Sequence, residues 1–498
     1  MENNQERNMG ERILMPMCSR VINSDVSEDF TLPDYYPEIR RVLYVNESPL
    51  PPSAFVGGNK IDVSGVIDYT LVYISADGNL CSAPLSAEHS CSVGLENAGY
   101  YEMGEGVTLM MHTACDNSVV RVIGPRKLNV RSHLRTCINA LGRVVCDMEI
   151  TEAEALSSIE RLMGSTQCAE IICESSDLIT LSERYAFRSD DRRIALARGN
   201  VNIDQTRIDG NIAEIVGEVV VNMTLVSSEE SENATIKLPF EAAVELEGGE
   251  PMDGGTVRAS GTVTNLSLNV EEDGADIEAD VTLKVCYGGN RLIEYVLDAY
   301  STQNDSRAIT RTYNIPTIAR NANINTTLGG RIALEEAGIP TEARIVDICP
   351  SVTFDGVESG DEGCFVKGKC RYHVIYMFEG DYLHAEVTLP YTLETGVDGE
   401  PIGWDLAIDV NDCRCRIDGN ELVIDSALLA AYTVLSGHEI EMLSGLELLD
   451  AEKKDSNCWT VVYVSPGDTS WSIAKRYGVS KGEMQGDPST DKFVIIER

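Results

Sequence analysis

The chain has 498 residues, of which 80 are acidic and 40 are basic, so its formal net charge is −40. Nucleic acid and anionic lipid both attract basic surfaces, so this charge argues against direct binding of either. Apolar residues make up 43% of the chain, which is enough to build ordinary globular cores.

The N-terminal segment (1–36) begins without the apolar run that a signal peptide needs, and no run of about 18 apolar residues occurs elsewhere. The 15 cysteines are scattered and include no Cys-x-x-Cys pair. This pattern is typical of free thiols in a reducing compartment rather than of a disulfide framework. We therefore expect a cytoplasmic protein that does not insert into a membrane.

In chain order, a possible short helix begins the stretch PDYYPEIRRVLYV (33–45), and strands dominate after it. Three stretches align on a glycine, with spacings of 152 and 151 residues, and alternate apolar with polar positions as half-buried strands do. These stretches are KIDVSGVIDYTLVY (60–73, on Gly65), IAEIVGEVVVNMTLV (212–226, on Gly217) and CFVKGKCRYHVIYMF (364–378, on Gly368).

A polar turn and a second strand follow each of the three stretches. Pro239 and Pro390 lie 22 residues after their aligned glycines, whereas Ala87 occupies this place in the first copy. A later pair of strands is expected to complete each copy. The two strands are predicted to form a hairpin, because Asp-Gly and similar dipeptides favour hairpin turns. These turns are expected at Asp116-Asn117, Asp273-Gly274 and Asp418-Gly419.

The fold class predicted from this repeat is mainly β, with three tandem antiparallel β-rich domains that resemble sandwiches. Helix is expected to be sparse, and its best candidate is TEAEALSSIERLMG (151–164). The expected domains cover residues 37–164, 165–318 and 319–445, followed by a polar linker at 446–457 and a small C-terminal domain at 458–498.

The three β repeats contain no recognisable catalytic, phosphate-binding or metal-binding motif. His373 and His384 flank one predicted hairpin and are able to approach each other, but surface or edge-strand histidines are the more common case. Cys413 and Cys415 share one face of a strand, yet two thiols fall short of a structural zinc site. We expect no enzyme activity, no metal and no cofactor, and interpret the repeats as assembly or binding modules.

The C-terminal segment predicts a β-α-α-β order within about 40 residues. WTVVYV (459–464) alternates as a strand does, and SWSIAKRYG (470–478) predicts a helix that ends at its glycine. Ser480-Lys481-Gly482-Glu483 has the form of a capping box, and FVII (493–496) predicts the closing strand.

This segment resembles a LysM domain, on Pro466-Gly467-Asp468-Thr469 and on the helix that follows. LysM domains generally bind polymers that contain N-acetylglucosamine, such as peptidoglycan or chitin, between the loop after the first strand and the loop before the last. The chain differs from the family at Ser470, where a Leu is usual, and in its short second loop, QGDPSTD. The candidate residues for binding a glycan or a protein partner are Gly467, Asp468, Thr469, Ser470, Trp471 and Lys475.

Trp471 lies one position off the expected core face of the helix, with Lys475 one turn away. An exposed Trp beside a Lys suits a protein contact or stacking on a sugar ring. Packing of Trp471 against its own domain is an equally weighted alternative.

Three β repeats followed by one LysM-like segment resemble the SipL-like family of clostridial spore-coat morphogenesis proteins. The resemblance also rests on LPDYYPEIRRVLYV (32–45) and on RKLNVRSHL (126–134). It implies a non-enzymatic protein of the mother cell that binds, through its LysM domain, a coat-basement ATPase on the forespore surface. The alternatives are a peptidoglycan-binding protein and a wall hydrolase, and the latter requires a catalytic domain between residues 37 and 450.

Overall fold

The computed structural model describes residues 11–95, 107–146, 149–150, 158–187, 192–227, 231–247, 252, 254–271, 273–360, 363–449 and 459–497. The chain is mainly β and its sheets are antiparallel, as the sequence predicts, apart from a two-residue parallel pairing of β8 (Glu149–Ile150) with β20. Within these residues, no helix is both long and apolar enough to cross a membrane.

The first sheet pair consists of two sheets that share the apolar core around Ile67, Leu71 and Leu128. One sheet has the order β1-β7-β6, and the other has the order β2-β4-β3 with β5 also paired to β4. Its strands are β1 (Glu11–Thr31), β2 (Ile39–Pro49), β3 (Ser53–Gly57), β4 (Lys60–Ser75), β5 (Leu80–Gly94), β6 (Thr108–Gly124) and β7 (Lys127–Cys146).

The second sheet pair repeats this plan with the orders β13-β14-β9 and β10-β11-β12, around a core that includes Val219 and Leu283. Its strands are β9 (Ile159–Ala186), β10 (Arg193–Asp209), β11 (Ile212–Val226), β12 (Ser231–Glu245), β13 (Thr256–Val270) and β14 (Gly274–Ser301).

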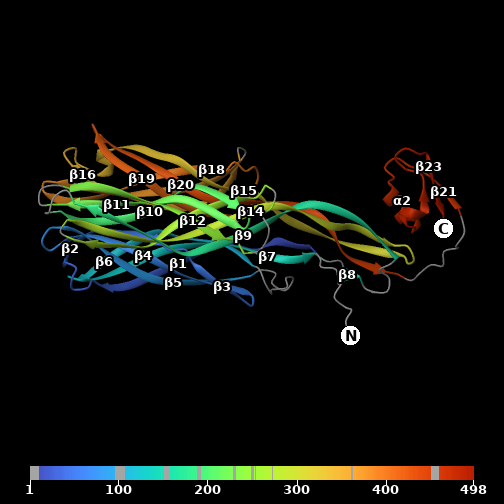
Figure 1. Ribbon diagram of the computed structural model, residues 1–498, viewed down its shortest axis with the longest axis horizontal. Helices are drawn as coiled ribbons and strands as arrows, with labels where there is room; N and C mark the ends of the chain where they lie inside the picture. Colours follow the sequence, from blue (N-terminus) through green and yellow to red (C-terminus); the bar gives the residue numbers. More distant parts are fainter. Residues whose placement is uncertain are drawn as a thin grey trace.

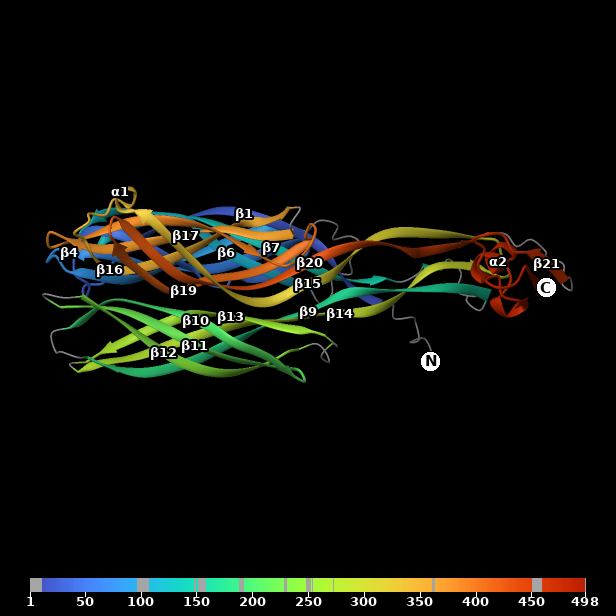
Figure 2. The same cartoon turned by 90° about the horizontal axis from the view of Figure 1, so that it is seen from above.

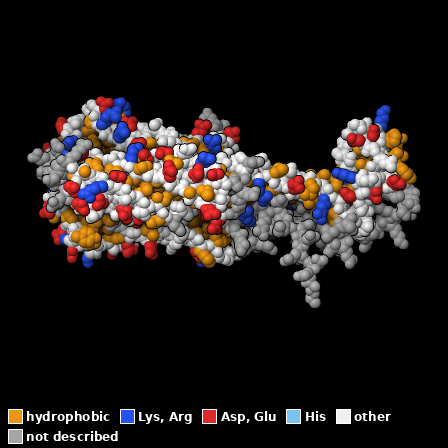
Figure 3. Space-filling view, in the orientation of Figure 1, with side chains coloured by type: hydrophobic (Ala, Val, Ile, Leu, Met, Phe, Trp, Pro, Cys, Tyr) orange, Lys and Arg blue, Asp and Glu red, His pale blue; other side chains and the backbone are white. Residues whose placement is uncertain are grey.

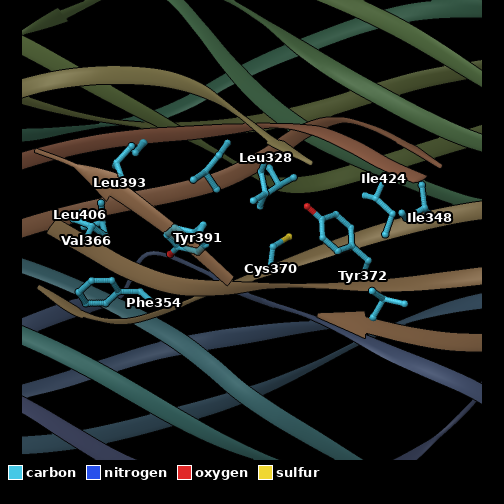
Figure 4. Close-up of a cluster of buried hydrophobic side chains, with 14 of the residues drawn as sticks. Leu328, Ile348, Phe354, Val366, Cys370, Tyr372, Tyr391, Leu393, Leu406 and Ile424 are labelled. Atoms are coloured by element: carbon cyan, nitrogen blue, oxygen red, sulfur yellow. The ribbon is translucent and has the colours of Figure 1, made fainter. Parts of the chain in front are cut away.

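The third sheet pair has the orders β15-β20-β19 and β16-β17-β18. Figure 4 shows its core, in which Tyr372, Cys370 and Ile424 lie among other apolar side chains between the two sheets. Its strands are β15 (Ser306–Ala333), β16 (Arg344–Gly360), β17 (Gly363–Phe378), β18 (Asp381–Glu394), β19 (Gly403–Asp418) and β20 (Glu421–Leu448).

The three glycines on which the sequence repeats align are each covered by a ring from the neighbouring strand. Gly65 lies opposite His89, Gly217 opposite Phe240 and Gly368 opposite Tyr391. A Cβ atom at any of the three would collide with that ring, so only glycine leaves room for it. The ring follows the glycine by 24 residues in the first copy and by 23 in the others, so the first copy has one more residue between its glycine and its ring.

Each sheet pair begins with a long strand that starts before the domain boundary expected from the sequence. β1 lies within the segment 1–36, β9 crosses the expected boundary between 164 and 165, and β15 crosses the one between 318 and 319. These strands pair with the last strand of their own unit, as in Phe30 opposite Leu128. The pairing joins residues about 100 positions apart, so no local pattern shows it.

The helices differ from the sequence prediction. Residues 159–164 belong to β9 and not to a helix, while 151–157 lie outside the described residues. Residues 34–36 form a turn before β2, and the described body has a short α1 (Leu334–Ala337) that the sequence analysis did not predict.

The hairpin turns were predicted in part. The turn at Asp418-Gly419 is confirmed, since Gly419 has a φ of 60°. The turn expected at Asp116-Asn117 is wrong, because these residues lie at a bulge inside β6 and the chain reverses at Pro125-Arg126. At the bulge, Asp116 accepts a hydrogen bond of 2.9 Å from Arg135.

Buried ion pairs join the sheet pairs to one another. Arg258 of the second pair, which is 0% exposed, binds Asp405 of the third, and Lys284 contacts the same carboxylate at 3.0 Å. The two cations hold the pKa of Asp405 far below its usual value despite its burial. Arg198 makes a two-pronged contact with Asp347 at 2.6 and 3.0 Å, which again joins the second and third pairs.

A stalk extends from this body toward the C-terminal module (Figures 1 and 2). It consists of the first halves of β9 and β15 and the second halves of β14 and β20, which pair as β9 with β14 and β15 with β20. Its interior is apolar and includes Ile293, Ile315 and Met442. Strand β20 runs to Leu448, so the start of the expected linker at 446–457 is strand, and 450–457 lie outside the described residues.

Candidate binding site on the C-terminal module

The C-terminal module is the described segment 459–497, and its elements differ from the β-α-α-β order expected from the sequence in two ways. The second helix is a single 3₁₀ turn, η3 (Lys481–Glu483), that leads into a short extra strand. The remaining elements are β21 (Trp459–Tyr463), α2 (Ser470–Tyr477), β22 (Met484–Gln485) and β23 (Phe493–Glu497), and the sheet order is β21-β23-β22.

Local signals in the sequence account for the boundaries of α2. The Thr469 side chain accepts a hydrogen bond from the Ser472 amide, and the Ser472 hydroxyl accepts one from the Thr469 amide. This reciprocal capping satisfies two amides at the start of the helix. Gly478 ends the helix with a φ of 61°, as its position after the last helical residue predicts.

The first loop of the module is shaped by the predicted site residues themselves. Asp468 accepts hydrogen bonds from the Ser465 amide and from Arg476, and these interactions lower the pKa of its carboxyl group. Gly467 takes a φ of 91°, which favours glycine. Gly467, Asp468 and Thr469 thus form a turn that leads into α2 at Ser470, and the Asp468 and Thr469 side chains hold its shape through their hydrogen bonds.

The second loop lies beside the first. The Val464 amide donates a hydrogen bond of 3.0 Å to the Lys492 carbonyl, so the two loops leave the sheet at the same end. Within the second loop, the Asp487 carboxylate accepts hydrogen bonds from the amide and hydroxyl of Ser489. The short sequence QGDPSTD therefore folds as a compact turn next to the first loop.

Trp471 and Lys475 face the stalk. The Trp471 indole donates a hydrogen bond of 2.8 Å to Asp298 of β14, and Lys475 contacts the same carboxylate at 2.6 Å. Trp471 is only 9% exposed and lies edge-on to Tyr300, with ring centroids 4.9 Å apart. The structure thus brings both residues together, but at an internal joint.

Tyr300 completes this joint. It belongs to the same buried cluster as Ile473, Val494 and Ile496 of the module, and its hydroxyl donates a hydrogen bond of 2.7 Å to the Val479 carbonyl. From the sequence, Trp471 was expected either to be exposed or to pack on its own domain. Instead it also packs on Asp298 and Tyr300 of the distant strand β14. A stalk tyrosine therefore forms part of the module's core.

An exposed apolar face on the outer side of the module sheet was missed in the sequence analysis. Side chains alternate along a strand, so Val462 points into the core while its neighbours point outward. Figure 3 shows hydrophobic side chains along the outer edge of the module. We call this the aromatic face, and its members with their exposed fractions are Trp459 (61%), Val461 (53%), Tyr463 (77%) and Phe493 (47%).

The sequence WTVVYV (459–464) already indicates this exposed apolar face. The pattern was used to predict a strand, yet large apolar residues stand at its outward positions as well as at its inward ones. Tyr463 lies opposite Phe493 in the register, and their rings are 6.4 Å apart in an edge-on arrangement. A surface cluster of this kind on a small module is typical of a contact site.

The two histidines singled out from the sequence do meet. Nδ1 of His373 lies 3.1 Å from Nε2 of His384, and Tyr44 of the first sheet pair stacks on both rings. Burial lowers the pKa of His373 to about 3 and that of His384 to about 4. Neither they nor the half-buried Cys413 and Cys415 belong to a group of three or more potential metal ligands among the described residues.

A cavity of about 1090 Å³ lies where the three sheet pairs meet. Its charged lining groups include Arg198, Lys284 and Asp409. Arg198 binds Asp347, Lys284 binds Asp405, and Asp409 accepts hydrogen bonds from Asn200. These groups are thus engaged in joining the sheet pairs.

Comparison with known proteins identifies no relative: no family model, no curated protein and no solved structure matches the chain.

Proposed function

We propose that the protein is a non-enzymatic scaffold whose C-terminal module binds another protein through the aromatic face. The observation that carries this proposal is the cluster of Trp459, Val461, Tyr463 and Phe493 on the outer side of the module sheet. The edge strand β21 contributes three of these side chains, so a partner has access to both apolar side chains and an unpaired strand edge.

The charge distribution supports the same choice of surface. The module carries four basic and five acidic residues between 459 and 497, whereas the whole chain has a net charge of −40. Strong like charge on the body opposes nonspecific association of copies of the chain. The nearly neutral module is therefore the part on which an apolar contact meets the least electrostatic opposition.

The identity of the partner in this proposal follows from the resemblance to the spore-coat morphogenesis family. The β-α-η-β order and the capped α2 support a LysM-like module, and the three similar sheet pairs support three tandem sandwich domains with a common ancestor. The proposed partner is the coat-basement ATPase at the forespore surface, and the proposed location is the mother-cell cytoplasm and the spore coat.

Co-sedimentation of the full chain with filaments of this ATPase tests the proposal. The double substitution Tyr463→Ser and Phe493→Ser should lower the affinity at least about tenfold, because buried aromatic anchors dominate protein interfaces. The matched control is Phe55→Ser, which removes an exposed aromatic side chain of the first sheet pair. Equal binding by the double variant and the wild type would refute the role of the aromatic face.

Binding of peptidoglycan or a chitin-type glycan is the second candidate function. It is favoured by the adjacent positions of the loops at 465–469 and 486–492, which the Val464–Lys492 hydrogen bond brings together. Calorimetric titration of the full chain with a chitin oligosaccharide distinguishes the two functions. Saturable binding that persists in the Tyr463→Ser, Phe493→Ser variant would favour the glycan, and absence of heat would favour the protein partner.

A further inference from the structure

Two cysteines face each other at the root of the stalk. Cys173 of β9 and Cys286 of β14 are direct partners in the antiparallel register. The Cys173 thiol donates a hydrogen bond to the Cys286 sulfur, and the two sulfur atoms are 3.0 Å apart. A disulfide bond of about 2 Å therefore needs only a small movement of the two side chains.

The surroundings of the two sulfur atoms are asymmetric. Cys286 is 0% exposed, whereas Cys173 is of intermediate exposure, so a small reagent would reach the pair from the Cys173 side. Arg258 of β13 lies opposite Cys286 in the register, so a cation and two cysteines form one row across three strands. Nη1 of Arg258 is buried without a hydrogen-bond partner among the described residues.

This row favours a thiolate. The hydrogen bond from Cys173 and the charge of Arg258 lower the pKa of Cys286 to about 6, although burial opposes the shift. The same hydrogen bond and burial raise the pKa of Cys173. The pair thus holds one proton between two sulfur atoms, and the proton is able to pass along the S–H···S bond.

We propose that Cys173 and Cys286 are a redox-active dithiol that closes to a disulfide when a hydroperoxide reaches Cys173. The Cys173 sulfur, after passing its proton to Cys286, attacks the outer peroxide oxygen. The O–O bond breaks, Cys173 becomes a sulfenic acid, and the leaving oxygen takes a proton from solvent. The Cys286 sulfur then releases its proton and attacks the Cys173 sulfur, and the S–O bond breaks with loss of water. The two thiols are oxidised and the peroxide is reduced.

The position of the pair gives the disulfide a structural effect. Cys286 belongs to a buried cluster that includes Leu14, Ala169 and Leu435, one residue from each of the three sheet pairs. A bond here links β9 to β14, the strand that carries Asp298 and Tyr300 toward the module. Oxidation therefore fastens the stalk at the point where it leaves the body.

Peptide mapping of the full chain tests this proposal. The reduced protein is exposed to hydrogen peroxide, alkylated and digested, and the expected product is a 173–286 linked peptide that dithiothreitol removes. Cys173→Ala should abolish the link. Cys91→Ala is the matched control, because Cys91 is also partly exposed but lies opposite Val63, and this variant should keep the link.

The oxidised wild type should also unfold at a higher temperature than the reduced protein, and Cys173→Ala should lack this shift. The proposal is overturned if Cys91 is oxidised while Cys173 and Cys286 remain thiols, or if the dominant link joins other cysteines. The wild-type map decides the question by itself if a variant does not fold.

Discussion

An aspartate holds the contact between two sheet pairs, and another aspartate holds the contact between the stalk and the module, but the first is buried and the second is partly exposed. In the body, Asp405 is 3% exposed and is held between Arg258 and Lys284. At the module, Asp298 is 23% exposed and holds Trp471 and Lys475. Loss of one partner of a buried ion pair strongly destabilises the fold, because the other charge is left buried and unpaired. Loss of one partner of an exposed pair costs little, because water solvates the remaining charge. The comparison indicates a rigid body with a more easily opened joint at its end.

The largest effect is expected at the buried joint. Asp405→Ala leaves Arg258 and Lys284 without their counter-charge and should lower the free energy of unfolding by about 3–5 kcal/mol. Urea unfolding followed by circular dichroism measures this change. The matched control is Asp425→Ala, which breaks the exposed pair with Arg416 and should cost less than about 1 kcal/mol. Similar losses in the two variants would contradict the distinction by depth.

Acid should weaken the body through His373. Its pKa is about 3 in the folded state against 6.5 when unperturbed, because burial, His384 and Arg371 disfavour its charged form. The unfolded state therefore binds more protons below pH 6.5, so stability is lost as the pH falls, by up to ~3 kcal/mol at pH 4.

Thermal unfolding of His373→Phe between pH 7 and pH 4 checks this prediction. The variant should show a flatter dependence on pH than the wild type. His133→Gln is the control, since His133 is exposed and contacts Asp25 on the surface. An unchanged slope in His373→Phe would show that other groups cause the loss at low pH.

A smaller loss is expected at the repeat glycines. Gly368→Ala would place a methyl group against the Thr353 carbonyl and the Tyr391 ring, and should lower the free energy of unfolding by about 1–3 kcal/mol. Gly356→Ala is the control, because nothing lies within 4 Å of its added Cβ atom. An unchanged free energy of unfolding in Gly368→Ala would mean that the Tyr391 ring moves aside without cost.

The smallest effect on global stability is expected at the module joint. Asp298→Ala removes the acceptor of Trp471 and the partner of Lys475, and should cost about 1 kcal/mol. Hydrogen exchange at residues 470–479 should nevertheless become faster, because this joint opens locally. Glu294→Ala on the exposed side of the same strand should leave the exchange unchanged. Unaltered exchange in Asp298→Ala would show that Tyr300 alone holds the module.

The sequence by itself determined the mainly β class, the threefold glycine repeat and, in the C-terminal module, the first strand, the helix after it and the last strand. These features depend on local signals: alternation along strands, the turn at Asp418-Gly419, the helix stop at Gly478 and the capping box that begins at Ser480. The candidate loop at Gly467 and Asp468 was expected from the resemblance to LysM domains, and the hydrogen bonds that shape it connect residues close in sequence.

Only the tertiary structure decided the long first strands, the stalk and the side of the module that remains exposed. The stretch 159–164 has the composition of a helix, yet it is a strand because its backbone pairs with β14 more than 130 residues away. Likewise, Trp471 is buried because Asp298 and Tyr300 meet it from a distant strand. Such contacts arise from packing between remote segments, and no local pattern in a single sequence contains them.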